Sequence, residues 1–298
     1  MPGKIEEEED NDDGFWQVAF MNDNAVVGCE RDLSDDDDKD TEKDSSAVGK
    51  ATTYNFKDMS ISLRELPAED GILSPVGADA WYASALLTSL ILQDSDNDKR
   101  IIHSELPNRP LRVLELGSGT KALPGFAAAI ALAKERFPSW TVTLTDNDMD
   151  CLRQLKSNVQ VNRSKILHDN TFINVECLDW GDNFESNPTS KDLLKTNVVI
   201  GSELVYTNET ARALVNVFTA LFAHNDNIDI WIVQVMDRSG WQEIVLPFVG
   251  AREDVTVETI PMPWDVHEMA SSMIPMGGAL DRHAFGAYRF SKRGLEQT

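Results

Sequence analysis

Basic residues are scarce in this chain of 298 residues, which contains 27 Lys and Arg against 50 Asp and Glu and carries a formal net charge of −23. Such an acidic chain has little with which to displace counterions from a phosphate backbone, so we expect no nucleic acid partner. Long apolar runs are also missing, because none approaches the ~18 residues of a membrane-spanning helix. The first ten residues, MPGKIEEEED, lack the basic start and apolar core of a signal peptide. We therefore expect no membrane partner.

Cysteine and metal-binding patterns are sparse too. The three cysteines, Cys29, Cys151 and Cys177, are too widely spaced for a disulfide framework in a chain of this length. The five histidines show no metal-ligand spacing, and neither HExxH nor CxxC occurs, so no metal site is predicted. These features favour a reduced protein. We expect a monomer located in the cytoplasm, or in the nucleus as well.

Acidic residues are concentrated near the N-terminus. Residues 1–50 hold seventeen acids and five bases, including the runs Glu6–Asp10 and Asp35–Asp38, and offer little to bury. We predict an acidic, mostly disordered tail over residues 1–50 and one folded domain over residues 51–298. Within the tail, the apolar segment Gly14–Gly28 is compatible with a short strand pair on the domain or with a segment that docks elsewhere.

The domain shows strands that alternate with helices. Residues 53–66 alternate apolar and polar side chains, which predicts a hairpin, and a helical pattern follows over 80–93 with Asp79 as its expected cap. Further strands are predicted at 111–116, 140–146, 172–180, 197–206, 228–236, 255–260 and 284–290, and helices at 123–137, 149–162, 209–223 and 239–249. Strands separated by helices indicate crossover units. We predict an α/β fold with a doubly wound, mostly parallel, Rossmann-like sheet of seven strands and an N-terminal hairpin and helix extension.

Ligands of such sheets bind outside the carboxyl ends of the strands, so the residues at these ends are the candidates for a site. After the first strand, Gly117 and Gly119 allow a tight turn and close approach of a ligand, although the same turn is also an ordinary structural device. Asp146 follows Gly119 by 27 residues, where an acid can bind a ribose diol. Alternatively, the stretch Asp146–Asp148 only caps the next helix.

Two more strand ends carry polar and aromatic side chains. Asp179 and Trp180 combine an acceptor with a flat apolar surface, which suits an adenine, although a lone Trp after a strand is as often part of the core. Glu203 and Tyr206 follow Ser202 just past a buried strand, where polar groups are unusual unless they face a cleft. A helix cap beside a half-buried Tyr is the alternative. Together, the four ends offer what an adenosine ligand needs.

Two cofactors compete for this pattern. The stretch Gly117–Ala122 can be interpreted as a dinucleotide fingerprint with Ala in its third position, which would make the protein an NAD(P)-dependent oxidoreductase. Glu115 favours S-adenosylmethionine instead, because a carboxylate would repel a pyrophosphate and suits a cationic ligand. Asp146 and Asp179 add negative charge, and no base is placed for a second phosphate.

The motifs VLELGSG, TDND, LDW and IGSELVY, each in its place among the strands, resemble those of methyltransferase family 16. The resemblance spans roughly Thr53 to Phe290, includes the AWYASALL stretch ahead of the first strand, and excludes the acidic tail. It implies a seven-strand, S-adenosylmethionine-dependent methyltransferase fold with the last strand antiparallel. Many members of this family methylate lysines in proteins, so a protein-lysine methyltransferase is the leading hypothesis.

The resemblance also implies roles for individual residues. Those expected to contact S-adenosylmethionine are Trp81 above it, Glu115, Gly117, Ser118 and Gly119 beneath its methionine end, Asp146 and Asn147 at the ribose, Asp179 and Trp180 at the adenine, and Ser202 in the pocket wall. Glu203 and Tyr206 are expected to meet the incoming amine as the catalytic pair. Because the chain is acidic, we expect a protein substrate with a basic surface.

Two features depart from this simple picture. Lys121 and Ala122 stand where the family pattern has a single glycine, so the loop gains a residue and a cation. We expect Lys121 to point to water, and its presence keeps a non-catalytic scaffold with this fold as a third hypothesis. Residues 260–278 are rich in Met and resemble a loop, either a lid or substrate-recognition insertion or a packing element.

Overall fold

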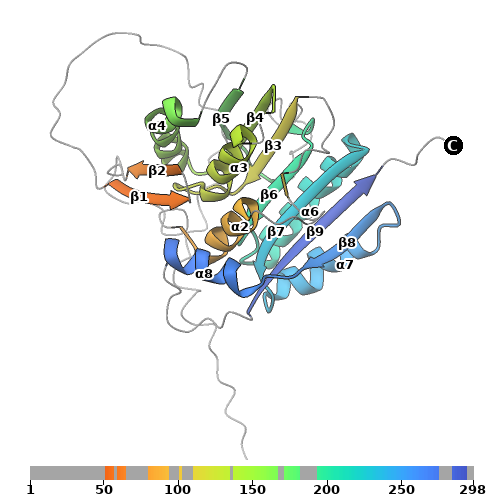
Figure 1. The fold of residues 1–298 in the computed structure, drawn as a ribbon. Helices are drawn as coiled ribbons and strands as arrows, with labels where there is room; N and C mark the ends of the chain where they lie inside the picture. The colour runs from red at the N-terminus through yellow and green to blue at the C-terminus, as the bar shows by residue number, and fades with distance from the viewer. Residues whose placement is uncertain are drawn as a thin grey trace, which may run out of the picture. The chain divides into compact units, whose positions relative to one another are not determined.

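In the computed structural model, one sheet of seven strands runs through the described part of the chain, with the strand order β5-β4-β3-β6-β7-β9-β8 (Figure 1). The described residues are 51–56, 59–64, 80–93, 101–102, 110–134, 137–166, 171–181, 193–274 and 284–293. The predicted tail of residues 1–50 lies outside them, so the division into tail and domain stays a prediction. The strands are β3 (Leu111–Leu116), β4 (Trp140–Asp146), β5 (Thr171–Cys177), β6 (Val198–Ser202), β7 (Asn227–Val235), β8 (Val255–Ile260) and β9 (Phe285–Arg293).

The direction of the strands confirms the doubly wound, mostly parallel sheet. Strands β5, β4, β3, β6 and β7 are parallel neighbours, and β9 lies antiparallel between β7 and β8, so the last strand is antiparallel as expected. The chain moves outward from β3 to β5 and then returns to place β6 on the other side of β3. This reversal creates a switch point beside β3, where the carboxyl ends of the strands open a crevice.

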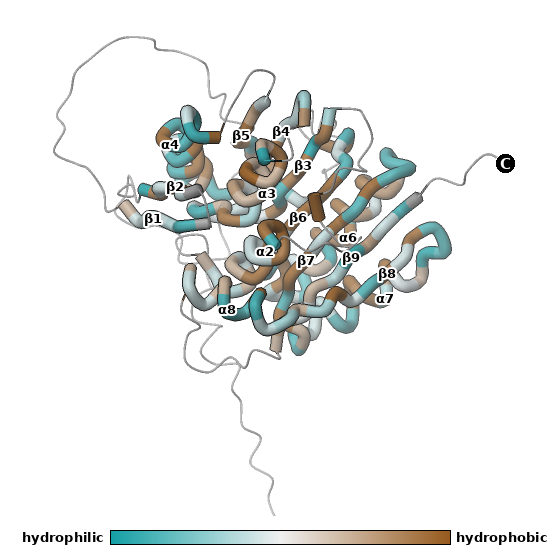
Figure 2. Tube along the Cα trace, viewed as in Figure 1, coloured by the Kyte–Doolittle hydropathy of each residue, from teal (hydrophilic) through white to brown (hydrophobic). Residues whose placement is uncertain are grey.

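Helices cover both faces of the sheet. The helices α2 (Tyr82–Leu92), α3 (Leu123–Lys134), α4 (Met149–Ile166) and α8 (Trp264–Met273) belong to one hydrophobic cluster, and α6 (Asn208–His224), the π-helical turn η2 (Trp241–Val245) and α7 (Leu246–Gly250) belong to a second. In Figure 2, α2 and the central strands are mainly apolar, whereas α4 carries many hydrophilic residues. Burial on both faces explains why β7 is almost continuously apolar. No helix among the described residues is both long and apolar enough to span a membrane.

The predicted hairpin is present as β1 (Ala51–Phe56) and β2 (Met59–Arg64), which pair antiparallel. Alternate residues of β2 enter the core, because Ile61 and Leu63 are buried while their neighbours are more exposed. The hairpin lies beside α4 rather than extending the main sheet (Figure 1).

Three local predictions need correction. Trp81 occupies the N-cap of α2, so the helix begins later than expected, and the expected cap Asp79 lies outside the described residues. Strand β6 ends at Ser202, because Glu203 has a left-handed φ of 50° that the strand cannot accommodate. Residues 260–278 are not simply a loop. Helix α8 forms there and packs against α2 through Val266, His267 and Ala270, which favours the packing element over the lid.

Candidate active site

The loop after β3 is fixed to the end of β4 by hydrogen bonds. The Ser118 N–H donates to the Thr145 carbonyl (2.8 Å), and the Thr145 N–H donates to Ser118 Oγ (3.1 Å). Gly117 and Gly119 have φ values of 59° and 57°, which only glycine adopts without strain. The predicted tight turn is therefore confirmed, and β3 and β4 present their carboxyl ends as one surface.

Asp146 joins this loop to its own turn. Its Oδ2 accepts a hydrogen bond from the Gly119 N–H (2.8 Å) and its Oδ1 from the Asp148 N–H (3.0 Å). Burial raises the pKa of Asp146, and these two N–H donors act in the opposite direction. The cap of α4 is Asp148, whose Oδ1 accepts from the N–H groups of Asp150 and Cys151. Asp146 is thus free of the capping role, and Asn147 is exposed beside it.

Glu115 lies beneath the loop rather than on its open side. Only 2% of the residue is exposed, and its Oε2 has no hydrogen-bond partner among the described residues. The carboxyl group packs under α3, where a Cβ added to Gly125 would overlap Glu115 Oε2 and Leu144 Cδ2. Burial raises the pKa of Glu115 to about 8, so the group holds a proton at neutral pH. The expected repulsion of a pyrophosphate by this carboxylate is therefore weaker than the sequence suggests.

The end of β5 adds an aromatic wall to the same edge. Trp180 is half-buried, and its ring atoms lie 3.7 and 3.8 Å from the position that a Cβ on Gly117 would take. Leu204 Cδ2 is 3.1 Å from that position, so a side chain at residue 117 would crowd Leu204 and Trp180. Asp179 is exposed and accepts a hydrogen bond from the Gly181 N–H (3.1 Å). Trp180 and the glycine loop are thus brought together as predicted.

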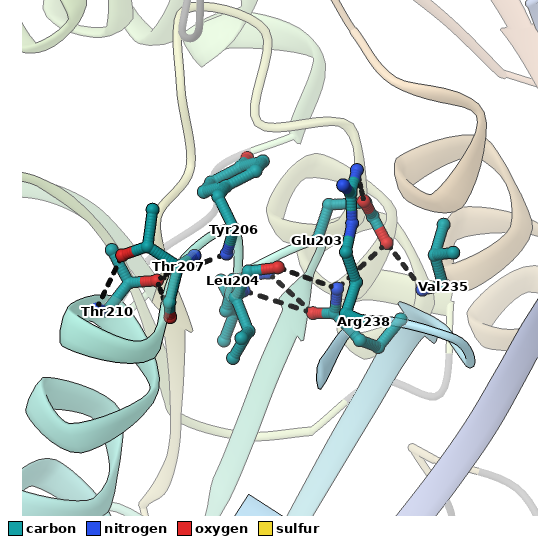
Figure 3. Close-up of polar contacts among 9 residues, drawn as sticks. Glu203, Leu204, Tyr206, Thr207, Thr210, Val235 and Arg238 are labelled. Atoms are coloured by element: carbon teal, nitrogen blue, oxygen red, sulfur yellow. Dashed lines mark hydrogen bonds and ion pairs between the residues drawn. The ribbon is translucent and has the colours of Figure 1, made fainter. Parts of the chain in front are cut away.

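The carboxylate of Glu203 turns toward β7. Its Oε1 accepts hydrogen bonds from the Val235 N–H (2.6 Å) and the Gln234 side chain (3.1 Å), and its Oε2 lies 3.7 Å from Arg238 Nη2. Burial raises the pKa of Glu203 to about 7, although the Val235 N–H and the Arg238 charge act in the opposite direction. In Figure 3 the Glu203 carboxylate lies beside Arg238 and Val235, away from the Tyr206 ring. The predicted pair shares one turn, but its two polar ends do not touch there.

Tyr206 faces the entry helix. Its ring centroid is 6.2 Å from that of Trp81, with the planes tilted by 56°, so the residue before α2 and the turn after β6 form one aromatic corner. Burial raises the pKa of the Tyr206 hydroxyl, and the charges of Glu203 and Asp146 raise it further. The phenol therefore stays neutral and keeps its hydroxyl proton at neutral pH. Ser202, at the end of β6, is half-buried beside this turn.

Two residues of this edge were not predicted from the sequence. Gln234 is fully buried, and its Oε1 accepts from the N–H groups of Leu204 (2.9 Å) and Val205 (3.2 Å). Its Nε2 donates to Glu203 Oε1 and to the Val205 carbonyl, both at 3.1 Å. Gln234 and Arg238 thus hold the β6–α6 turn and the carboxylate within it. The sequence signal for Gln234 was an amide side chain inside the mainly apolar strand IDIWIVQV.

The glycine loop also differs from expectation at Lys121. This residue is only 4% exposed, so the prediction that it points to water is wrong. The following Ala122 has a φ of 43°, a left-handed conformation in the place where the family pattern has glycine. The loop therefore accommodates the extra residue with Lys121 buried and with Ala122 in a left-handed conformation that is unfavourable for alanine. Among the described residues, no group of three or more His, Cys, Asp and Glu side chains is arranged to hold a metal ion.

The edge just described fits S-adenosylmethionine. The Asp146 carboxylate at the end of β4 suits a cationic ligand. Glu115, buried beneath the loop with its Oε2 unpartnered among the described residues, adds to that charge once it is ionised. A doubly wound sheet with an antiparallel strand between its last two parallel strands, and with this edge, defines a protein of the seven-strand methyltransferase class.

Comparison with known families supports the same assignment. The model of a family described as lysine methyltransferase, methyltransferase family 16, matches residues 62–243, which is more than half of the chain. The protein belongs to this family. Its membership favours methyl transfer over the oxidoreductase alternative. No curated protein matches the sequence.

Several solved structures are similar in part. A predicted O-methyltransferase from Agrobacterium tumefaciens is 15% identical, covers 70% of this chain and 80% of its own, and has a TM-score of 0.41. The human methyltransferase 10 domain containing protein is 14% identical over 73% of this chain and 84% of its own, with a TM-score of 0.38. A methyltransferase from Geobacter sulfurreducens is 14% identical over 63% and 73%, with a TM-score of 0.34. Similarity this low carries no information about the methyl acceptor.

Proposed function

We propose that this protein uses S-adenosylmethionine to methylate a lysine side chain of a protein substrate that has a basic surface. The family match supports the lysine acceptor, and the formal net charge of −23 supports a basic partner. The observation that carries the proposal is the aromatic corner of Trp81 and Tyr206, where the Tyr206 hydroxyl is within reach of the charges of Glu203 and Asp146. Aromatic faces and carboxylates together favour a cationic acceptor such as a lysine.

The cofactor supplies, when bound, a methyl group on a positively charged sulfur. The lysine nitrogen forms the new N–C bond as the S–C bond breaks, and it must first lose a proton because a free lysine has a pKa of about 10.4. In this proposal the Tyr206 hydroxyl and the Trp81 ring orient the amine and exclude water. Glu203, whose Oε1 is already engaged by β7, contributes negative charge to the site once it is ionised, above its pKa of about 7. Asp146 would hold the ribose of the cofactor, and Trp180 would flank its adenine.

The test is transfer of labelled methyl groups from S-adenosylmethionine to basic proteins and peptides, with the modified residue located by mass spectrometry. Tyr206→Phe and Glu203→Gln should each lower turnover by about tenfold or more. Tyr288→Phe is the matched control, because Tyr288 is equally aromatic but lies in β9 within the second hydrophobic cluster. Unchanged turnover in both site variants would overturn the assigned roles. Label on a residue other than lysine would overturn the acceptor, and absence of cofactor binding would favour the scaffold.

A further inference from the structure

The outer edge of strand β2 is covered by side-chain amides instead of a third strand. Asn162 Oδ1 accepts from the Ser62 N–H (3.0 Å), and Asn162 Nδ2 donates to the Ser62 carbonyl (2.8 Å). One helical turn earlier, Asn158 Oδ1 accepts from the Arg64 N–H (2.7 Å). Gln154, a further turn back, donates to the Arg64 carbonyl (2.9 Å). These amides, four residues apart on α4, satisfy the backbone groups that β1 leaves unpaired.

Asn158 differs from the other two amides because it also reaches the glycine loop. Its Nδ2 donates to the Thr120 carbonyl at 3.3 Å, and the residue is fully buried. Thr120 stands between Gly119 and the strained Ala122, in a loop with three left-handed residues. Such a conformation persists only where its surroundings hold it. Asn158 therefore connects the hairpin and the glycine loop through one side chain.

We propose that Asn158 is a positioning residue for the cofactor loop, which it holds through the Thr120 carbonyl. The inference rests on the proposed function, in that the loop is taken to bind S-adenosylmethionine. Removing the amide takes the Asn158 hydrogen bond from the buried Thr120 carbonyl, so the loop relaxes away from the conformation that the ligand needs. Asn158 itself does not touch the ligand.

Asn162 supplies a matched control. Both residues are fully buried amides on the same face of α4, and each accepts from one β2 N–H group. Asn162 donates its Nδ2 hydrogens to Ser62 and to the Asn158 carbonyl, whereas Asn158 donates to the loop. If both residues had a purely structural role, their substitution by alanine would change cofactor affinity to the same extent. If Asn158 positions the loop, only the Asn158 variant should lose affinity.

The experiment compares full-length Asn158→Ala and Asn162→Ala by two measurements. Calorimetric titration with S-adenosylhomocysteine should show an affinity about five- to tenfold weaker than wild type for Asn158→Ala and close to wild type for Asn162→Ala. Both substitutions should lower the melting temperature of the protein. Hydrogen exchange in a peptide that covers residues 117–122 should accelerate only in Asn158→Ala. If that variant does not fold, Asn158→Asp keeps the acceptor for Arg64 and removes the amide donor to Thr120.

Equal affinity and equal loop exchange in the Asn158 and Asn162 variants would overturn the positioning role. Its failure is distinguishable from failure of the proposed function. If wild-type protein binds no S-adenosylhomocysteine, the cofactor assignment fails, and the exchange measurement alone decides whether Asn158 holds the loop. If wild type binds but methylates no lysine, only the acceptor assignment fails. Faster loop exchange and weaker binding confined to the Asn158 variant support the inference.

Discussion

At the residue scale, two buried carboxyl groups at the ligand edge hold protons near neutral pH. The pKa is about 8 for Glu115 and about 7 for Glu203, and burial is the main cause in both. At neutral pH this edge is therefore less negative than its formal charges indicate. A cationic ligand favours the ionised carboxylates, so its binding drives protons off these groups.

We expect S-adenosylmethionine to bind more tightly as the pH rises from about 6 to about 8. Over this range Glu115 and Glu203 lose their protons before the ligand binds, so binding no longer has to remove them. S-adenosylhomocysteine lacks the sulfonium charge and should show a smaller slope. Calorimetry in buffers of different ionisation enthalpy measures the released protons directly. Glu115→Gln should flatten the slope, and equal slopes for the two ligands would contradict this account.

Gln234 is the side chain on which the β6–α6 turn depends. Gln234→Leu removes its four hydrogen bonds to residues 203–205 and leaves buried N–H groups unpaired, so we expect a loss of about 2–4 kcal/mol in the free energy of unfolding. Gln242→Leu is the control, since Gln242 is exposed and its side-chain amide donates to the Met236 carbonyl at the surface. Urea denaturation measures both. A loss below 1 kcal/mol at Gln234 would show that water replaces the amide.

At the element scale, helix α3 approaches β3 and β4 very closely at Gly125. A Cβ at this position would overlap Glu115 Oε2 and Leu144 Cδ2, so we expect Gly125→Ala to destabilise the fold by about 1–3 kcal/mol. Gly250, the last residue of α7, has no atom within 4 Å of the same position. Gly250→Ala should therefore be neutral or stabilise by up to about 1 kcal/mol. Thermal unfolding of the two variants checks the contrast, and destabilisation of similar size in both would refute it.

The regular alternation of strands and helices is what made the sheet predictable. Continuous apolar runs such as β7 and the strand-end positions of Asp146 and Ser202 follow from periodicity and from the geometry of parallel sheets. Helix α8 was missed because it is short and enclosed by prolines and methionines. The amides of α4 were hidden for another reason. They occupy what looks like the solvated face of an amphipathic helix, and only the docked hairpin explains their burial.

At the scale of the whole molecule, charge is the dominant property. The formal net charge of −23 should draw a basic substrate toward the protein and should be screened by salt. We expect the KM for a basic peptide substrate to rise at least severalfold between about 0.05 and 0.5 M NaCl, with little change in kcat. The dissociation constant of S-adenosylhomocysteine serves as the control and should change less. A KM independent of salt would show that the peptide is recognised by shape instead.

The amide-covered edge of β2 also has a consequence for biosynthesis. Its partners on α4 follow it by 94 and 100 residues, so a nascent hairpin leaves the ribosome well before the helix that completes it. At about 5–20 residues per second, this interval lasts roughly 5–20 s. A two-stranded hairpin is marginal alone, so this edge is exposed to chaperones or to other chains during that time. The hairpin can dock only after α4 has been synthesised, and the same helix brings Asn158 to the glycine loop.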